Sequence, residues 1–157
     1  PHPQGLRGTG QGSAQPVVGL TSGVVLDTNL LLRLFLDGHP VLSSRVEAWI
    51  RQAFSARQPE LIVLPTVLTE MVFAFRVNVP PFTHAQILAV LDALLDMPFT
   101  VVERAVVEAA VEQYRLVHAR DWEDCLIAAY ATQLAEGRLA TYDRSLSKFP
   151  GIVAVAP

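Results

Sequence analysis

The acidic side chains that could do chemistry in this chain form a small set. Most of its acids stand where the exposed face of a helix would place them, and they need no further role. Four others follow apolar strands, stand inside an apolar helix or crowd together at a helix start: Asp27, Glu70, Asp124 and Asp143. Carboxylates gathered in one place repel one another unless a cation lies between them, so their placement decides which chemistry is open to the chain.

Two of the four acids come just after predicted strands. Asp27 follows the apolar run 24–26, and Asp143 follows the predicted strand 138–141 after one intervening residue. Open parallel sheets bind their ligands at the carboxyl edge of the strands, so both positions are typical of ligand-binding residues. Taken singly, each Asp could equally cap the helix or helical turn that follows it.

The other two acids stand in predicted helices. Glu70 lies in an apolar stretch, where a charge is costly to bury unless it is paired or bound to a cation. The alternative is an exposed Glu with Arg76 nearby. Asp124 is the third residue of a helix that Asp121 would cap, so a capping arrangement is its alternative. Capping explains less well why three acids fall within residues 121–124, because they repel one another.

Apolar runs alternate with helical patterns along the chain and predict the elements that position these acids. Strands are predicted at 24–27, 61–64, 99–102, 138–141 and 152–155. Helices are predicted at 29–36, 43–57, 104–119 and 121–136, from Pro65 and after Thr83, with a helical turn at 145–149. Strands that alternate with helices imply right-handed crossovers and a parallel sheet with helices on both faces. We therefore predict a single α/β domain at 24–157, preceded by a flexible Gly- and Pro-rich tail at 1–23.

Helical spacing also predicts which faces of the later helices are buried. In the helix at 104–119 the inward residues are Val107, Ala110, Val111 and Tyr114. In the helix that begins at Asp121 they are Leu126, Ile127, Tyr130 and Leu134, and Gly137 ends that helix in the left-handed conformation.

The four acids are predicted to converge. The carboxyl ends of parallel strands share one edge, so Asp27, Asp143 and the helix start that holds Asp124 would meet there, with Glu70 above them. Ligation by oxygen alone suits Mg²⁺ or Mn²⁺ and not zinc. A hard divalent cation in an open crevice is suited to the hydrolysis of phosphate esters, because it activates a bound water and offsets charge on the phosphate.

Composition limits the partners of such a site. The 157 residues, 51% of them hydrophobic and 17% charged, are enough for a real core and exclude wholesale disorder. The net charge of −3 means that contact with nucleic acid must be local or assisted by a metal. No membrane span or secretory signal is visible, and the single Cys125 cannot form an internal disulfide, so a cytoplasmic protein is expected.

Three segments and Glu70, in order along the chain, resemble the PIN-domain family. Residues 25–29 (VLDTN) match its start, and Glu70 lies in an apolar helix as the family pattern has it. Residues 121–128 (DWEDCLIA) resemble the family segment D-[FW]-x-D-[AC]-L-I-A. Residues 139–144 (LATYDR), followed by Phe149-Pro150-Gly151, resemble its end. Each motif is weak alone, but the four in order, across nearly all of 24–155, are specific.

The resemblance implies a five-stranded sheet of order 3-2-1-4-5 and a nuclease that depends on Mg²⁺ or Mn²⁺. The short single-domain form is most similar to the VapC-type toxins of toxin–antitoxin pairs. In that group the substrate is RNA, the protein is usually a homodimer, and the C-terminal segment of an antitoxin occludes the site.

Carried over by residue, the resemblance makes Asp27, Glu70, Asp124 and Asp143 the acidic quartet. Cations would be bridged by the three Asp residues, while Glu70 orients the attacking water. The groups that would orient the quartet or add a further acid are Thr28, Asn29, Asp121 and Thr141. The candidates for phosphate contacts are Arg33, Arg76, Arg120, Arg144 and Lys148, each of which could equally be a solvated surface charge.

Two other classes of function compete with this hypothesis. A catalytically silent module of the same fold could bind a partner through the apolar stretches 71–79 and 83–97, although core packing explains these stretches as well. A metal-dependent phosphohydrolase of the common α/β type would need an Asp-x-Asp pair after the first strand, and Asn29 stands at the second position. Nucleophilic hydrolysis by Ser or Cys lacks support, because no Gly-x-Ser-x-Gly occurs and Cys125 lies in an apolar helix.

Overall fold

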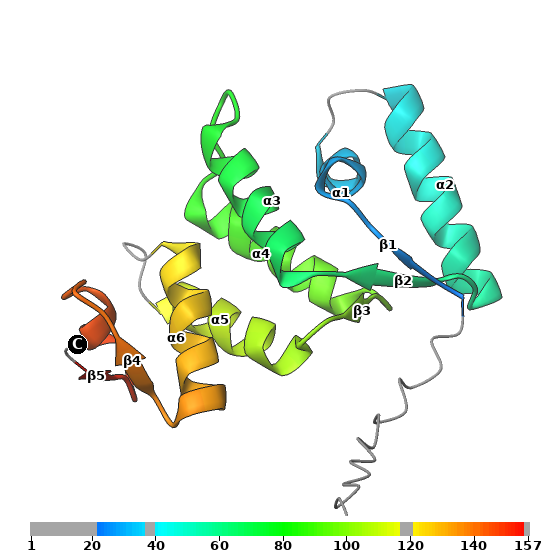
Figure 1. Ribbon diagram of the computed structural model, residues 1–157. Helices are drawn as coiled ribbons and strands as arrows, with labels where there is room; N and C mark the ends of the chain where they lie inside the picture. Colours follow the sequence, from blue (N-terminus) through cyan, green and yellow to red (C-terminus); the bar gives the residue numbers. More distant parts are fainter. Residues whose placement is uncertain (1–21, 37–39, 117–120, 156–157) are drawn as a thin grey trace, which may run out of the picture.

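The computed structural model describes residues 22–36, 40–116 and 121–155. The predicted tail therefore lies almost wholly outside the described residues, as does Arg120. The helices are α1 (Thr28–Phe35), α2 (Pro40–Ala56), α3 (Pro65–Val77), α4 (His84–Asp96), α5 (Arg104–Leu116), α6 (Trp122–Ala135) and the 3₁₀ turn η1 (Leu146–Lys148). The strands are β1 (Gly23–Val25), β2 (Glu60–Val63), β3 (Thr100–Val101), β4 (Arg138–Ala140) and β5 (Val153–Val155) (Figure 1). Every predicted element is present, with bounds that move by a few residues.

The described strands form two parallel sheets. In the first, β2 lies between β1 and β3, so that Val24 is opposite Leu61 and Ile62 is opposite Thr100. In the second, β4 pairs with β5, and Leu139 is opposite Ala154. The predicted neighbours 3-2, 2-1 and 4-5 are thus confirmed, all of them in the parallel sense.

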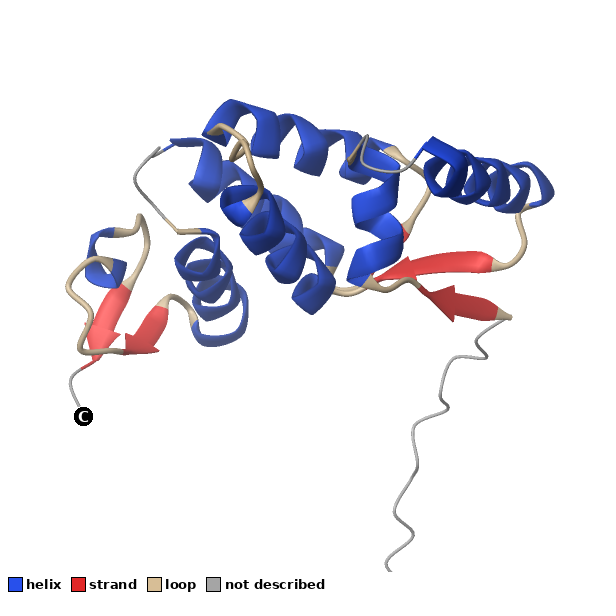
Figure 2. Cartoon of the chain, turned by 90° about the horizontal axis from the view of Figure 1, so that it is seen from above, coloured by secondary structure: helices blue, strands red, loops and turns tan. Residues whose placement is uncertain are grey.

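The predicted order 3-2-1-4-5 is wrong at one pairing, because β4 does not lie beside β1. In both views β4 and β5 lie at the opposite end of the molecule from β1, beyond α6 (Figures 1 and 2). The cause is the packing of α6, which lies along α5 and against α3 with Trp122 and Cys125 fully buried. The tight turn at Gly137 joins β4 directly to α6, so the position of α6 carries β4 away from β1.

The helix α3 lies in the core and follows directly from its sequence. Pro65 occupies its first turn, where the missing N–H costs nothing. Apolar residues at helical spacing then form one buried face: Val67, Leu68, Met71, Val72 and Phe75. Phe82 returns to this helix after the loop, stacking on Phe75 with ring centroids 4.8 Å apart. This burial fixes the position of α3, which carries Glu70.

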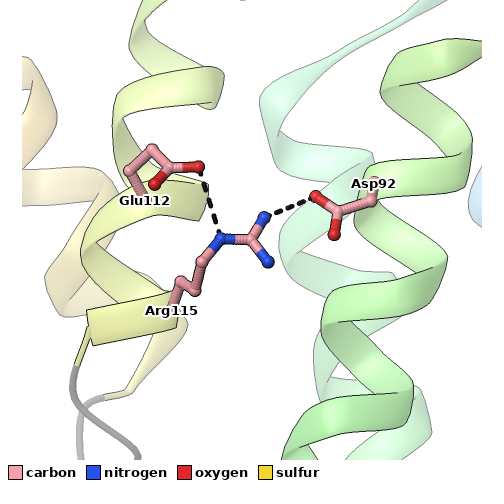
Figure 3. A network of polar contacts seen from close by, with 3 residues as sticks. All are labelled: Asp92, Glu112 and Arg115. Atoms are coloured by element: carbon pink, nitrogen blue, oxygen red, sulfur yellow. Dashed lines mark hydrogen bonds and ion pairs between the residues drawn. The ribbon is translucent and has the colours of Figure 1, made fainter.

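The helix α4 is capped at its start and is linked to α5 by surface ion pairs. Thr83 caps α4 as predicted, in a reciprocal capping box with Gln86. Arg115 of α5 lies between Glu112 of its own helix and Asp92 of α4, with Nη2 2.7 Å from the Asp92 carboxylate (Figure 3). The three side chains are between 41% and 65% exposed, so solvent weakens the ion pairs and they add little to stability.

The buried face of α5 is confirmed, whereas that of α6 is right at Leu126 and Tyr130, which pack partly buried against the core, and wrong at the other two positions. All four residues predicted to point inward from α5 are buried. On α6, however, Ile127 is 42% exposed and Leu134 is 76% exposed. The buried residues of α6 are instead Trp122, Cys125, Ala128, Ala129 and Ala131. Small side chains on this face let α6 approach α5 closely, and that gain in packing overrides the larger aliphatic residues.

Candidate functional site

Asp27 lies at the carboxyl end of β1 and also caps α1. The N–H of Leu26 donates to the carbonyl of Ile62 at 2.9 Å, which ties the end of β1 to β2. One carboxylate oxygen of Asp27 accepts from the N–H of Leu30 at 2.8 Å. The two interpretations of the sequence are therefore compatible, since the cap uses one oxygen and holds the carboxylate at the sheet edge.

Glu70 is exposed on α3, so the expectation that it would be a costly buried charge is wrong. Its neighbours along the helix point inward, and Glu70 itself points outward. It is not paired with Arg76. The hydroxyl of Thr28, the first residue of α1, donates instead to Oε2 of Glu70. This contact joins the start of α1 to α3 and brings Glu70 to the residue that follows Asp27.

Asp124 is half-buried near the start of α6 and is crowded by other acids. Burial raises the pKa of its carboxyl, and the charges of Asp143, Asp121 and Glu123 raise it further. The influence of Asp143 shows that the turn after β4 comes back to α6. Asp124 and Asp143 thus form a second carboxylate pair.

Asp143 is exposed and held by the turn in which it lies. The backbone N–H of Ser145 donates to Oδ1 of Asp143 at 2.7 Å, and bonds from Ser145 lower the pKa of the carboxyl. The N–H of Asp143 donates in turn to the Thr141 hydroxyl at 2.9 Å. Asp143 therefore lies in the turn that the sequence offered as its alternative role. The hydrogen bonds of that turn fix the direction of the carboxylate.

Asp121 occupies the cap position of α6 without using its side chain as a cap. Its carboxylate instead pairs with Arg76 of α3, at 2.7 Å from Nη1. Arg33, Asn29 and Arg144 are exposed, and their predicted roles toward phosphate or metal stay predictions.

Sequence reasoning missed the contacts between α3 and α6. Trp122 donates its indole N–H to the Thr69 hydroxyl at 3.0 Å, and Arg76 binds Asp121. A buried Trp is expected to find an acceptor for its N–H, which is the one signal available in the sequence. The identity of the acceptor depends on how the two helices pack, and spacing along the chain does not give it.

The described contacts relate the quartet as two pairs: Glu70 bonds Thr28, the residue that follows Asp27, and Asp143 acts electrostatically on Asp124. Across the described ranges, no three His, Cys, Asp or Glu side chains lie together as they would around a metal ion. The donor chemistry nevertheless fits a hard cation, because both pairs offer carboxylate oxygens and Asp124 carries a crowding that a positive charge would relieve. The helices α3 and α6, which carry Glu70 and Asp124, contact each other.

A cavity of about 470 Å³ lies elsewhere, at the amino end of β2. Its lining consists of Ala53, Phe54, Arg57, Pro59, Glu60, Leu61 and Pro98. It contains none of the quartet, and it lies at the opposite end of β2 from the edge beside Asp27. We do not connect it with the candidate site.

Comparison with known proteins defines the class. A model of the PIN domain matches residues 24–152, which is most of the chain, and the chain belongs to the PIN domain family. PIN domains are typically nucleases and generally use divalent metal ions. No curated protein and no solved structure matches the chain. Within the part of the chain that the structure describes, no helix has the length and apolar character needed to cross a membrane.

Proposed function

We propose that this chain is a metal-dependent endoribonuclease that hydrolyses phosphodiester bonds of RNA with the acids Asp27, Glu70, Asp124 and Asp143. The observation that carries the proposal is the crowding at Asp124, whose pKa is raised by burial and by three neighbouring carboxylates. Carboxylates crowded in this way repel one another. A bound cation or a metal-bound substrate would offset that repulsion. Membership of the PIN domain family supports a nuclease.

The cations in this proposal are one or two Mg²⁺ or Mn²⁺ ions, which Asp27, Asp124 and Asp143 would hold. When bound, they supply Lewis-acid stabilisation of charge on the scissile phosphate and lower the pKa of a bound water. Oxygen donors alone favour these ions over zinc.

The residues of the chain orient the reactants. Thr28 fixes the Glu70 carboxylate by donating to one of its oxygens, and the other oxygen is then directed for a hydrogen bond to the attacking water. In the overall reaction the water oxygen bonds to phosphorus and gives up one proton, the bond from phosphorus to the ribose oxygen breaks, and the leaving ribose oxygen takes up one proton. Arg33 and Arg144, both exposed, are the proposed contacts to the flanking phosphates.

We further propose that the protein is the toxin of a cytoplasmic toxin–antitoxin pair, that it forms a homodimer, and that an antitoxin segment covers the site. The support is an apolar surface formed by Phe73 and Val77 of α3 and by Val79 of the next loop, all exposed. The stretch 83–97 supports it less, because α4 turns Ile87, Leu91 and Leu94 into the core.

The test is the change Asp27→Asn, with Glu47→Gln on α2 as the matched control, since Glu47 is an exposed acid outside the quartet. We expect Asp27→Asn to reduce Mn²⁺-dependent cleavage of RNA by more than about 100-fold, because ligands matter at least as much as their supporting partners. Circular dichroism establishes that both variants are folded. Unchanged cleavage by folded Asp27→Asn would refute the proposal.

The second candidate function is a catalytically silent module that binds a protein partner through the surface at Phe73, Val77 and Val79. Titration calorimetry with Mn²⁺ separates the two candidates. A nuclease gives a binding isotherm that Asp27→Asn weakens, whereas a silent module gives none.

A further inference from the structure

One part-buried hydrogen bond joins the side chains of α6 and α3. Trp122 is 0% exposed, and its Nε1–H donates to the hydroxyl of half-buried Thr69 at 3.0 Å. Thr69 directly precedes Glu70, and Trp122 stands two residues before Asp124. The bond therefore joins the segment of α3 that carries one pair to the segment of α6 that carries part of the other.

The surroundings fix the geometry of this bond. The Thr69 hydroxyl donates to the carbonyl of Pro65 at 3.2 Å, which leaves its lone pairs for the indole N–H. The edge of the Trp122 ring meets Tyr114 of α5 with centroids 5.9 Å apart. Neither the hydroxyl nor the indole can turn without losing a partner, so each holds the other in place.

A second contact also joins α3 to the start of α6. Thr69 and Arg76 are seven residues apart and lie on one face of α3, and Arg76 binds Asp121 at 2.7 Å, next to Trp122. Both members of this ion pair are about half exposed, so solvent weakens it. The part-buried Thr69–Trp122 bond is the stronger constraint on how α6 is placed along and around α3.

We propose that Thr69 and Trp122 are positioning residues, whose hydrogen bond sets the spacing between the Asp27–Glu70 pair and the Asp124–Asp143 pair. This inference rests on the proposed function, in which the two pairs serve one metal-dependent site. A helix is stiff, so a small rotation of α6 against α3 moves the Asp124 carboxylate relative to Glu70 without unfolding either helix. Metal affinity depends steeply on such displacements.

The test compares Thr69→Val, which keeps the shape and removes the hydroxyl, with Thr69→Ser, which keeps the hydroxyl. Thr132→Val is the matched control, because the Thr132 hydroxyl bonds only the carbonyl of Ala128 in its own helix. Binding of Mn²⁺ is measured by calorimetry, and cleavage of RNA is resolved into kcat and KM. All variants carry Trp49→Phe, so that the fluorescence of the chain reports on Trp122 alone.

We expect Thr69→Val to weaken Mn²⁺ binding by about tenfold, at the low end of the range for supporting partners. We also expect kcat to fall more than KM rises and the Trp122 emission to change. Thr69→Ser should restore all three, and Thr132→Val should leave them unchanged. If Thr69→Val does not fold, Trp122→Phe, which removes the N–H and keeps an aromatic ring, takes its place, with Mn²⁺ binding, kcat and KM as the readouts.

The failure of this inference differs from the failure of the proposed function. If the parent protein binds no Mn²⁺ and Asp27→Asn changes nothing, the proposed function is refuted. If the parent binds Mn²⁺ and Asp27→Asn abolishes cleavage, but Thr69→Val behaves like Thr132→Val, the positioning role is refuted and the nuclease stands.

Discussion

At the scale of single residues, the two acids of the second pair are not equivalent. Burial and like charges raise the pKa of Asp124, whereas hydrogen bonds from Ser145 lower the pKa of Asp143. The charged form of Asp143 is thus stabilised by its own turn, and the charged form of Asp124 is opposed by its surroundings. In this pair, Asp124 has more to gain from a cation.

We expect Asp124→Asn and Asp143→Asn to change stability in opposite directions at pH 7 in EDTA. The pKa of Asp124 lies above its ordinary value of 3.8 in the folded chain, so its contribution to the free energy of unfolding falls as pH rises from 3.8 through that raised pKa. Asp124→Asn removes this penalty and stabilises the protein, by less than about 1 kcal/mol because the site is partly solvated. The lowered pKa of Asp143 has the opposite effect, because its charged carboxylate stabilises the folded chain at neutral pH. This stabilisation is lost as the pH falls through the lowered pKa, so Asp143→Asn destabilises the protein at pH 7.

Urea denaturation of both variants at pH 7 and pH 3 measures these differences. Both should shrink at pH 3, because this pH lies below the ordinary carboxyl pKa of 3.8 and the unfolded chain has then begun to take up these protons. Addition of Mn²⁺ should stabilise the parent more than Asp124→Asn. A less stable Asp124→Asn at pH 7 in EDTA would show that its charge is favoured by the fold, against the argument made for the crowding.

At the scale of elements, the turn from α6 to β4 determines where the second carboxylate pair lies. Glu136 and Gly137 both have positive φ, at 52° and 82°, and β4 begins at the next residue. The carbonyl of Gly137 accepts from the N–H of Val153 at 2.9 Å, which ties β5 to the same turn. The helix α6, the two strands and the turn that holds Asp143 are therefore positioned together.

Two glycines of this segment allow a matched comparison. A Cβ on Gly137 would lie 1.9 Å from the backbone oxygen of Gly151, whereas a Cβ on Gly151 would meet nothing within 4 Å. Both have positive φ, so Ala costs about 1–2 kcal/mol of backbone strain at either position. We expect Gly151→Ala to lose about that much stability in urea denaturation, and Gly137→Ala to lose clearly more, because two backbone segments must separate. Equal losses would show that the turn does not have this close approach.

At the scale of the whole molecule, the two sheets leave β1 and β4 each with one partner. Val24 is 40% exposed and Val25 is 56% exposed, which is unusual for the apolar strand of a parallel sheet. Open edges of this kind are sites where another strand can add.

Amide hydrogen exchange tests this arrangement directly. The N–H of Leu26 is bonded to Ile62, and successive residues of a strand direct their N–H groups to opposite edges, so the N–H of Val25 faces the open edge. We expect the Leu26 amide to exchange at least about 100-fold more slowly than that of Val25, because its exchange requires opening of the β1–β2 pairing. Equal protection of the two amides would show that a further strand covers this edge in solution.

Local sequence determined most of the elements and the family of this protein. The signals that predicted them act over a few residues, so they can be recognised without coordinates. They are the apolar runs, Pro65, the Thr83 cap and the motifs around Asp27, Asp124 and Asp143. The parallel neighbours within each sheet followed from the alternation of strands and helices. Each of the four acids was identified with the element or turn that holds it.

Tertiary structure decided how these parts meet. The contacts Thr28–Glu70 and Thr69–Trp122 join residues 42 and 53 positions apart, and the exposure of Glu70 depends on what packs around α3. The face of α6 that is buried, and with it the place of β4 away from β1, was set by close packing of small side chains on α5. Such contacts depend on the shapes of several helices at once, whereas periodicity in one segment reports only on that segment.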